Sequence, residues 1–81
     1  DNYKEALRIN RAIHGNDHPD VAKTLRNIGN IKADQGELKE ALDYYNQDLE
    51  ICRKHFGNDH PDVATTLNNI GEVYRVQGKY D

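Results

Sequence analysis

An eight-residue segment occurs twice in this chain, and the distance between its two copies constrains the fold more than any other feature. The segment Gly-Asn-Asp-His-Pro-Asp-Val-Ala occupies residues 15–22 and again residues 57–64, which gives a period of 42 residues. When residues 1–39 are aligned without a gap on residues 43–81, 20 of the 39 positions are identical. Chance does not produce such agreement. The chain is therefore built from copies of one structural unit, which stack on their neighbours.

Each copy of the unit carries the signals of two helices. Pro19 and Pro61 suit a first helical turn, and an aspartate follows each of them near the positive end of the helix dipole. Apolar residues then recur at spacings of three and four, as in an amphipathic helix; they are Val21, Leu25 and Ile28, and then Val63, Leu67, Ile70 and Tyr74. Gly36 and Gly78 follow as expected C-terminal caps. A second stripe predicts the next helix, which Gly57 ends; it comprises Leu38, Ala41, Leu42, Tyr45, Leu49, Cys52 and Phe56.

These signals predict an all-α fold of antiparallel helical hairpins with about four helices. We expect helices at about residues 2–13, 19–35, 37–56 and 61–77, and the opening of one more at residues 78–81. Residues 1–14 then form the second half of a repeat's second helix, residues 15–56 a full repeat, and residues 57–81 the start of a truncated one. Because the sequence opens without an initiator methionine, we expect a piece of a longer protein.

The repeated segments resemble a known family. The carriers are His-Pro-Asp-Val-Ala at 18–22 and 60–64, Thr-Leu-Asn-Asn-Ile-Gly-Glu-Val-Tyr at 66–74 and Gln-Gly-Lys-Tyr-Asp at 77–81. In these segments the chain is similar to tetratricopeptide (TPR) repeats, in particular the 42-residue repeats of kinesin light chains. The resemblance implies a right-handed superhelix of hairpins. It also implies that the first helix of each hairpin, the A helix, lines a concave groove for extended peptides or partner helices, while the second, the B helix, packs behind it.

The polar face of each A helix supplies the candidate groove residues. They are Lys23, Arg26, Asn27, Asn30 and Asp34 in one repeat and Thr65, Asn68, Asn69, Glu72 and Val76 in the next. Asn27 and Asn69 lie one period apart in mid-helix, although asparagine is a weak helix former. Because an amide side chain both donates and accepts, such a ladder is suited to holding a peptide backbone.

Two other interpretations of these residues stay open. The asparagines could be solvated or bond a neighbouring helix. Arg26, Asn30 and Asn69 also partly resemble the set with which some relatives hold a terminal carboxylate, although the third repeat that would complete the set is missing.

Composition and motifs argue against several other functions. The net charge is −3 and the 11 Lys and Arg residues are dispersed, so we expect no nucleic-acid partner and no RNA-reading repeat. No apolar run is long enough for a bilayer, and the single Cys52, expected in the core, fits a reducing, cytoplasmic location. We expect no cofactor and no enzyme, because no phosphate loop or nucleophile set is present. Four histidines surround the connectors without a metal-binding motif, so we expect no metal site; they are His14, His18, His55 and His60.

The leading hypothesis is thus a protein-binding scaffold or adaptor module, and the alternative is a structural spacer or self-assembling array. Gly29 and Gly71 lie in mid-helix and predict close helix packing. We expect the end helices to expose apolar residues that lack a neighbour, namely Val63, Leu67, Ile70 and Tyr74 at one end and Leu7 and Ile9 at the other. Since Asp81 is in the register of Lys39 and Asp1 in that of Asp43, chains could stack head to tail or exchange helices.

Overall fold

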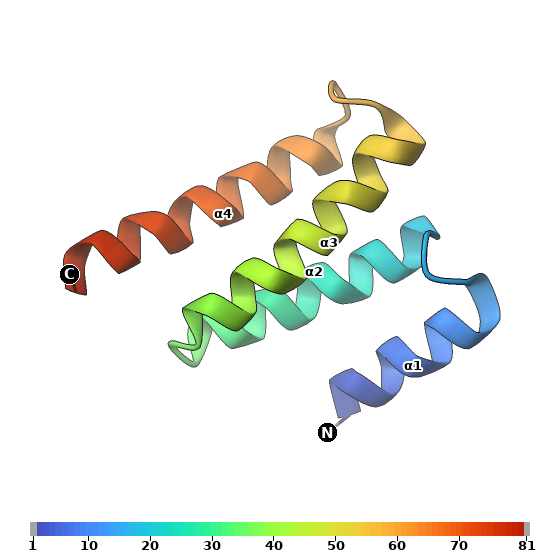
Figure 1. Cartoon of the computed structure of the whole chain (residues 1–81), viewed down its shortest axis with the longest axis horizontal. Helices are drawn as coiled ribbons and strands as arrows, with labels where there is room; N and C mark the ends of the chain where they lie inside the picture. The colour runs from blue at the N-terminus through green and yellow to red at the C-terminus, as the bar shows by residue number, and fades with distance from the viewer. Residues whose placement is uncertain (1, 81) are drawn as a thin grey trace.

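Four helices run antiparallel, each to the next, in the computed structural model, which describes the backbone of residues 2–80 and the side chains of residues 2–78 (Figure 1). They are α1 (Asn2–His14), α2 (Pro19–Asp34), α3 (Leu38–Phe56) and α4 (Pro61–Tyr80). The predicted all-α hairpin architecture is confirmed. None of the helices in the described region has the length and apolar character needed to cross a bilayer.

The connectors follow the repeated sequence closely. Gly36 adopts a φ of +81°, which turns the chain from α2 into α3 and which a residue with a Cβ rarely adopts. At the start of α2 the Nδ1 atom of His18 accepts a hydrogen bond of 3.0 Å from the backbone N–H of Asp20. His60 makes the same bond, at 3.1 Å, with Asp62. The two histidines recur because each satisfies a backbone donor in the first turn of its helix.

The expected end of the fourth helix is wrong, because α4 runs through Gly78 to Tyr80. The turn between α2 and α3 is stabilised by contacts of Lys32. Its backbone carbonyl accepts a hydrogen bond from the N–H of Glu37, and its ammonium pairs with the carboxylates of Glu37 and Glu40. One period later, Tyr74 stands in place of Lys32 and Lys79 in place of Glu37, so these ion pairs have no counterpart after Gly78. Residues 78–80 therefore continue the helix, and Asp81 lies outside the described residues.

The most extensive packing is between α2 and α3. Its centre is Gly29, where a Cβ atom would lie 2.7 Å from the ring of Tyr45. The close packing predicted at Gly29 is confirmed. At Gly71, one period later, no atom of another described helix lies within 4 Å of the Cβ position.

The buried stripe of α4 differs from the predicted one. Val63, which was expected to be exposed, is buried, and so are Thr66 and Val73. Leu67 and Tyr74 are exposed, as expected, and Ile70 is half-buried. The reason is that α4 packs mainly on α3, with a smaller contact on α2, and no described helix packs on the side that carries Leu67 and Tyr74. The Cα atoms span only 13 Å in the thinnest direction, so the helices form a thin slab with open faces.

Exposure at the N-terminal end is likewise only partly as expected. Ile9 is exposed, but Leu7 is buried in the cluster that α1 forms with α2 and α3. A hydrogen bond of 2.6 Å from the Asn10 amide to the hydroxyl of Thr24 also joins α1 to α2.

A fully buried carboxylate joins the other three helices. Asp48 of α3 has no exposed surface, and its oxygens accept from the Arg26 guanidinium of α2 at 2.9 and 3.1 Å. The hydroxyl of Thr66 on α4 lies 2.5 Å from Oδ2, and the Cys52 thiol donates to Oδ1 at 3.2 Å. Hydrogen bonding to Asp48 raises the pKa of the Arg26 guanidinium, so this side chain keeps its positive charge. The network offsets the cost of burying the charge.

Replacing Gly29 with alanine should destabilise the fold. The added Cβ overlaps the buried Tyr45 ring, a cost of about 1–3 kcal/mol that exceeds the gain of up to about 1 kcal/mol in helix propensity. Gly71→Ala is the matched control, because the space there is open and only the gain applies. Urea unfolding of dilute protein, followed by circular dichroism, compares the two; equal effects would contradict the packing role of Gly29.

Replacing Thr66 with valine should lower the free energy of unfolding by about 1–3 kcal/mol, because it removes a donor from the buried Asp48 carboxylate. Valine keeps the β-branched shape of threonine, so packing changes little. Thr65→Val is the neighbouring control, since the Thr65 hydroxyl bonds only the Pro61 carbonyl of its own helix. Urea titrations should show the control within about 0.5 kcal/mol of wild type.

The Cys52 thiol should be unreactive in the folded protein. Burial, reinforced by the hydrogen bond to Asp48, raises its pKa from 9.0 to about 12, so at pH 8 only about one molecule in ten thousand carries the thiolate. A disulfide reagent should label Cys52 in urea and not in buffer.

The Cys52 thiol should also make stability depend on pH. Because the unfolded thiol ionises first, the stability due to this group is lost as the pH rises from about 9 to about 12. A Cys52→Ala variant should lack that part of the decline, and fast labelling of folded protein at pH 8 would disprove the assignment.

Candidate functional site

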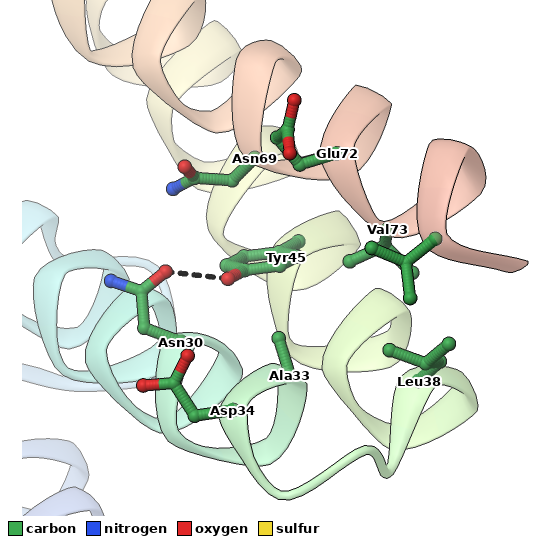
Figure 2. A pocket seen from close by; sticks show the side chains of 9 residues that line it. Asn30, Ala33, Asp34, Leu38, Tyr45, Asn69, Glu72 and Val73 are labelled. Atoms are coloured by element: carbon green, nitrogen blue, oxygen red, sulfur yellow. Dashed lines mark hydrogen bonds between the residues drawn. The ribbon is translucent and has the colours of Figure 1, made fainter. Parts of the chain in front are cut away.

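A cleft of about 460 Å³ lies between α2 and α4, with α3 as its floor (Figure 2). Because α3 runs antiparallel to both neighbours, α2 and α4 are parallel and present matching faces across it. The lining residues are Asn30, Ala33, Asp34, Leu38, Tyr45, Asn69, Glu72, Val73 and Val76. The volume suits a few side chains of a peptide and is too small for a folded domain.

Tyr45 forms the polar point of the floor. Its ring is buried against Gly29, and its hydroxyl donates a hydrogen bond of 2.5 Å to the Asn30 Oδ1 atom, as Figure 2 shows. Burial, with the nearby Asp34 carboxylate, raises the pKa of the Tyr45 phenol, so the hydroxyl keeps its proton at neutral pH. This bond orients the Asn30 amide, because its oxygen accepts from Tyr45 and its NH₂ group remains directed away from the ring.

Asn69 stands on the opposite wall. Within the described part of the chain its amide makes no hydrogen bond, so both its donor and its acceptor are available to a ligand. The apolar part of the lining comes from Ala33, Leu38, Val73 and Val76. The cleft therefore combines an apolar base with two amides that face each other from neighbouring A helices.

The charge of the lining is negative. Asp34 and Glu72 are carboxylates, and the nine lining residues include no lysine, arginine or histidine. Glu72 also pairs with Arg75 at 2.8 Å on the exposed side of α4, which partly neutralises it. Asp34 is exposed and is in no ion pair within residues 2–78. The potential in the cleft thus favours a cation over an anion.

Of the residues that the sequence proposed for the groove, five line this cleft: Asn30, Asp34, Asn69, Glu72 and Val76. Four others, Lys23, Asn27, Thr65 and Asn68, are exposed on α2 and α4 but are not part of the lining. The amide pair across the cleft is therefore Asn30 with Asn69, in place of the predicted ladder of Asn27 with Asn69. Two pairs of residues one period apart also line the cleft, Asn30 with Glu72 and Asp34 with Val76.

Arg26 needs a correction. Its guanidinium is largely buried against Asp48 and lies 3.9 Å from Asp62, so it joins helices and does not face a ligand. The sequence does contain one indication that Arg26 is not a groove residue. Asp48 is an acidic residue within the apolar stripe of α3, and a buried carboxylate needs a cation as its partner. Without Arg26 the set that resembled a carboxylate clamp is not assembled.

Four lining residues were missing from the sequence-based set: Ala33, Leu38, Tyr45 and Val73. Leu38 and Tyr45 belong to the predicted apolar stripe of α3, and that stripe could have indicated them, because a B helix between two A helices also reaches the groove floor. Val73 belongs to none of the apolar stripes that the sequence predicted.

Three potential metal ligands also gather at the first connector. The ligand atoms of His14, His18 and Asp20 lie within 4.8 Å of one another, and the two imidazole rings stack with centroids 4.2 Å apart. His18 already uses its Nδ1 lone pair to cap α2, so a metal ion would compete with the helix for it. In the second connector Phe56 replaces His14 and stacks on His60 in the same way, which indicates that stacking is the shared role.

The comparison with known protein families covers the whole chain. A model of the tetratricopeptide repeat matches residues 1–54 and again residues 29–81. No curated protein matches the chain. The two overlapping matches agree with the repeated helical hairpins. This chain belongs to the tetratricopeptide repeat family.

Proposed function

We propose that the chain is a protein-interaction module that binds an extended peptide in the cleft between α2 and α4. Tetratricopeptide repeats generally bind proteins, and the 42-residue period supports a long-repeat subtype similar to kinesin light chains. The observation that carries the proposal is the facing pair of amides, Asn30 and Asn69, above an apolar base.

The two amides suit the backbone of a peptide. An extended peptide presents one N–H and one C=O at each residue, and an asparagine can bond both at once. Tyr45 fixes the Asn30 amide before a ligand arrives, so less conformational entropy is lost on binding. Such contacts are independent of the peptide's side chains and give affinity for many sequences.

Selectivity would come from charge and from the apolar base. Asp34 at one end of the cleft offers an exposed carboxylate to a lysine or arginine of the peptide, and Leu38, Val73 and Val76 offer apolar contact to a neighbouring side chain. The preferred ligand is thus a peptide with a basic residue beside an apolar one, and an acidic peptide is disfavoured.

We also propose that the module is non-catalytic and acts in a reducing, cytoplasm-like compartment. The family is typically a scaffold, and the only cysteine is a buried thiol that packs against Asp48. Neither nucleic acid nor a membrane is a proposed partner, since the net charge is −3 and the cleft is acidic.

A second candidate function is a spacer or a self-assembling array, in which the stacking of repeats is itself the role. The observation that favours it is the uncovered side of α4, where Leu67 and Tyr74 are exposed. Repeat proteins normally cover such a side with a further helix or a polar cap.

Selection from a random peptide library should enrich sequences that contain lysine or arginine beside an apolar residue. The Asn30→Ala/Asn69→Ala variant should bind an enriched peptide at least tenfold more weakly, because at least two hydrogen bonds to its backbone, about 1 kcal/mol each, are removed. Asp34→Asn should reduce the preference for basic residues and leave most of the affinity. Isothermal calorimetry measures both effects.

The matched control is Asn27→Ala/Asn68→Ala, which removes two exposed amides from the same helices outside the cleft. Circular dichroism should show the same helix content for all variants. Equal loss of affinity in both double variants would place the peptide elsewhere. Failure of the library to yield any binder at millimolar protein would contradict the peptide-binding function of this chain.

A further inference from the structure

The exposed apolar residues of this chain lie on two separate faces, and each face has a buried counterpart within the same molecule. We propose that α1 of a second copy of the chain packs on the uncovered side of α4, in the manner of α3 on α2, so that copies join head to tail. This inference names the partner for the second candidate function and does not depend on the peptide cleft.

The receiving face is on α4 and contains Leu67 and Gly71. Leu67 is 44% exposed, whereas its counterpart Leu25 on α2 is 1% exposed beneath α3. The Cβ position of Gly71 has no atom within 4 Å, whereas that of Gly29 is filled by the Tyr45 ring. Glycine in mid-helix costs about 1 kcal/mol relative to alanine, and no contact within the described chain offsets that cost at Gly71. The open space at Gly71 thus corresponds to the space at Gly29 into which the Tyr45 ring packs.

The inserting face is on α1, which aligns with the second half of α3. Tyr3 is in the register of Tyr45, and Ile9 is in that of Ile51. Tyr3 is 50% exposed and Ile9 44%, whereas Tyr45 and Ile51 are 2% and 5% exposed. A second copy thus presents a tyrosine at the position needed to cover Gly71, and an isoleucine two turns further along the helix.

Charge does not oppose this contact. In the inner α2–α3 pair the buried ion pair is Arg26 with Asp48, and the corresponding residues of the outer faces are Asn68 on α4 and Ala6 on α1. On the outer faces, both members of this ion pair are therefore replaced by uncharged residues. Docking therefore buries no unpaired charge, which would otherwise cost several kcal/mol.

The geometry of the single chain also permits the contact. In the molecule, α3 packs on α2 and on α4 at the same time, so a B helix can serve two A helices. α1 packs on its own α2 and keeps its other side free for α4 of another copy. The contact uses different faces on the two copies and does not close, and the product is an open chain of copies.

The experiment is sedimentation velocity with light scattering on the wild-type chain over a wide concentration range. The average mass should rise continuously with concentration and should not stop at a dimer. Gly71→Ala should weaken association about tenfold or more, because its Cβ would meet the Tyr3 ring, although this variant should be at least as helical as wild type. Gly78→Ala is the control on the same helix and should leave association unchanged, since the Cβ position of its counterpart Gly36 meets no atom within 4 Å even where α3 packs on α2.

Mixing two variants, each damaged on a different face, provides the decisive test. Tyr3→Ala damages the inserting face and leaves α4 intact, whereas Gly71→Ala damages α4 and leaves α1 intact. Each variant alone should remain monomeric at concentrations at which the wild type associates, and an equal mixture should form dimers only, through the one pair of intact faces.

The outcomes separate the two proposals. A wild-type chain that stays monomeric throughout overturns both this interface and the self-assembling function. If the wild type associates and both variants associate as strongly, or if the mixture does not form dimers, this interface is wrong while self-assembly through another contact, such as an exchange of helices, stands.

Discussion

The buried carboxylate of Asp48 is the constraint on which the arrangement of the helices depends. A charge with no exposed surface is tolerated only if its partners occupy fixed positions, and here they come from three helices: Arg26 from α2, Cys52 from α3 and Thr66 from α4. Apolar contacts alone would allow α4 to slide or rotate on α3. Because a small domain buries little apolar surface, directional bonds of this kind matter more in setting the register than they would in a large core.

The same register places the amides of the cleft. With α2 and α4 both fixed on α3, Asn30 and Asn69 lie on opposite walls above Tyr45, and the Tyr45 ring is in turn held by the gap at Gly29. The packing of α3 on α2 and the lining of the cleft are thus connected through one tyrosine. A substitution that displaces this ring would change the cleft as well as the core.

Several details show how far pattern alone reaches. The 42-residue period and the spacing of apolar residues predicted four helices, and Pro19, Pro61 and Gly36 marked their ends within a few residues. Arg26 shows the limit, because a cation on the polar side of an amphipathic helix can face solvent or a buried carboxylate, and helical periodicity does not distinguish the two. Gly78 shows another limit. It follows the repeat pattern but does not end its helix, whereas the exposure of Leu67 was predicted.

What the sequence by itself determined is the repeat, its helices and the close contact at Gly29, because these depend on local spacing and on residues that recur in each unit. What only the tertiary structure decided is which asparagines lie across the cleft from each other and which charge is buried. Those outcomes depend on which side of each helix meets a neighbour. The periodicity of a single helix does not contain this information, because it arises when one helix packs on another.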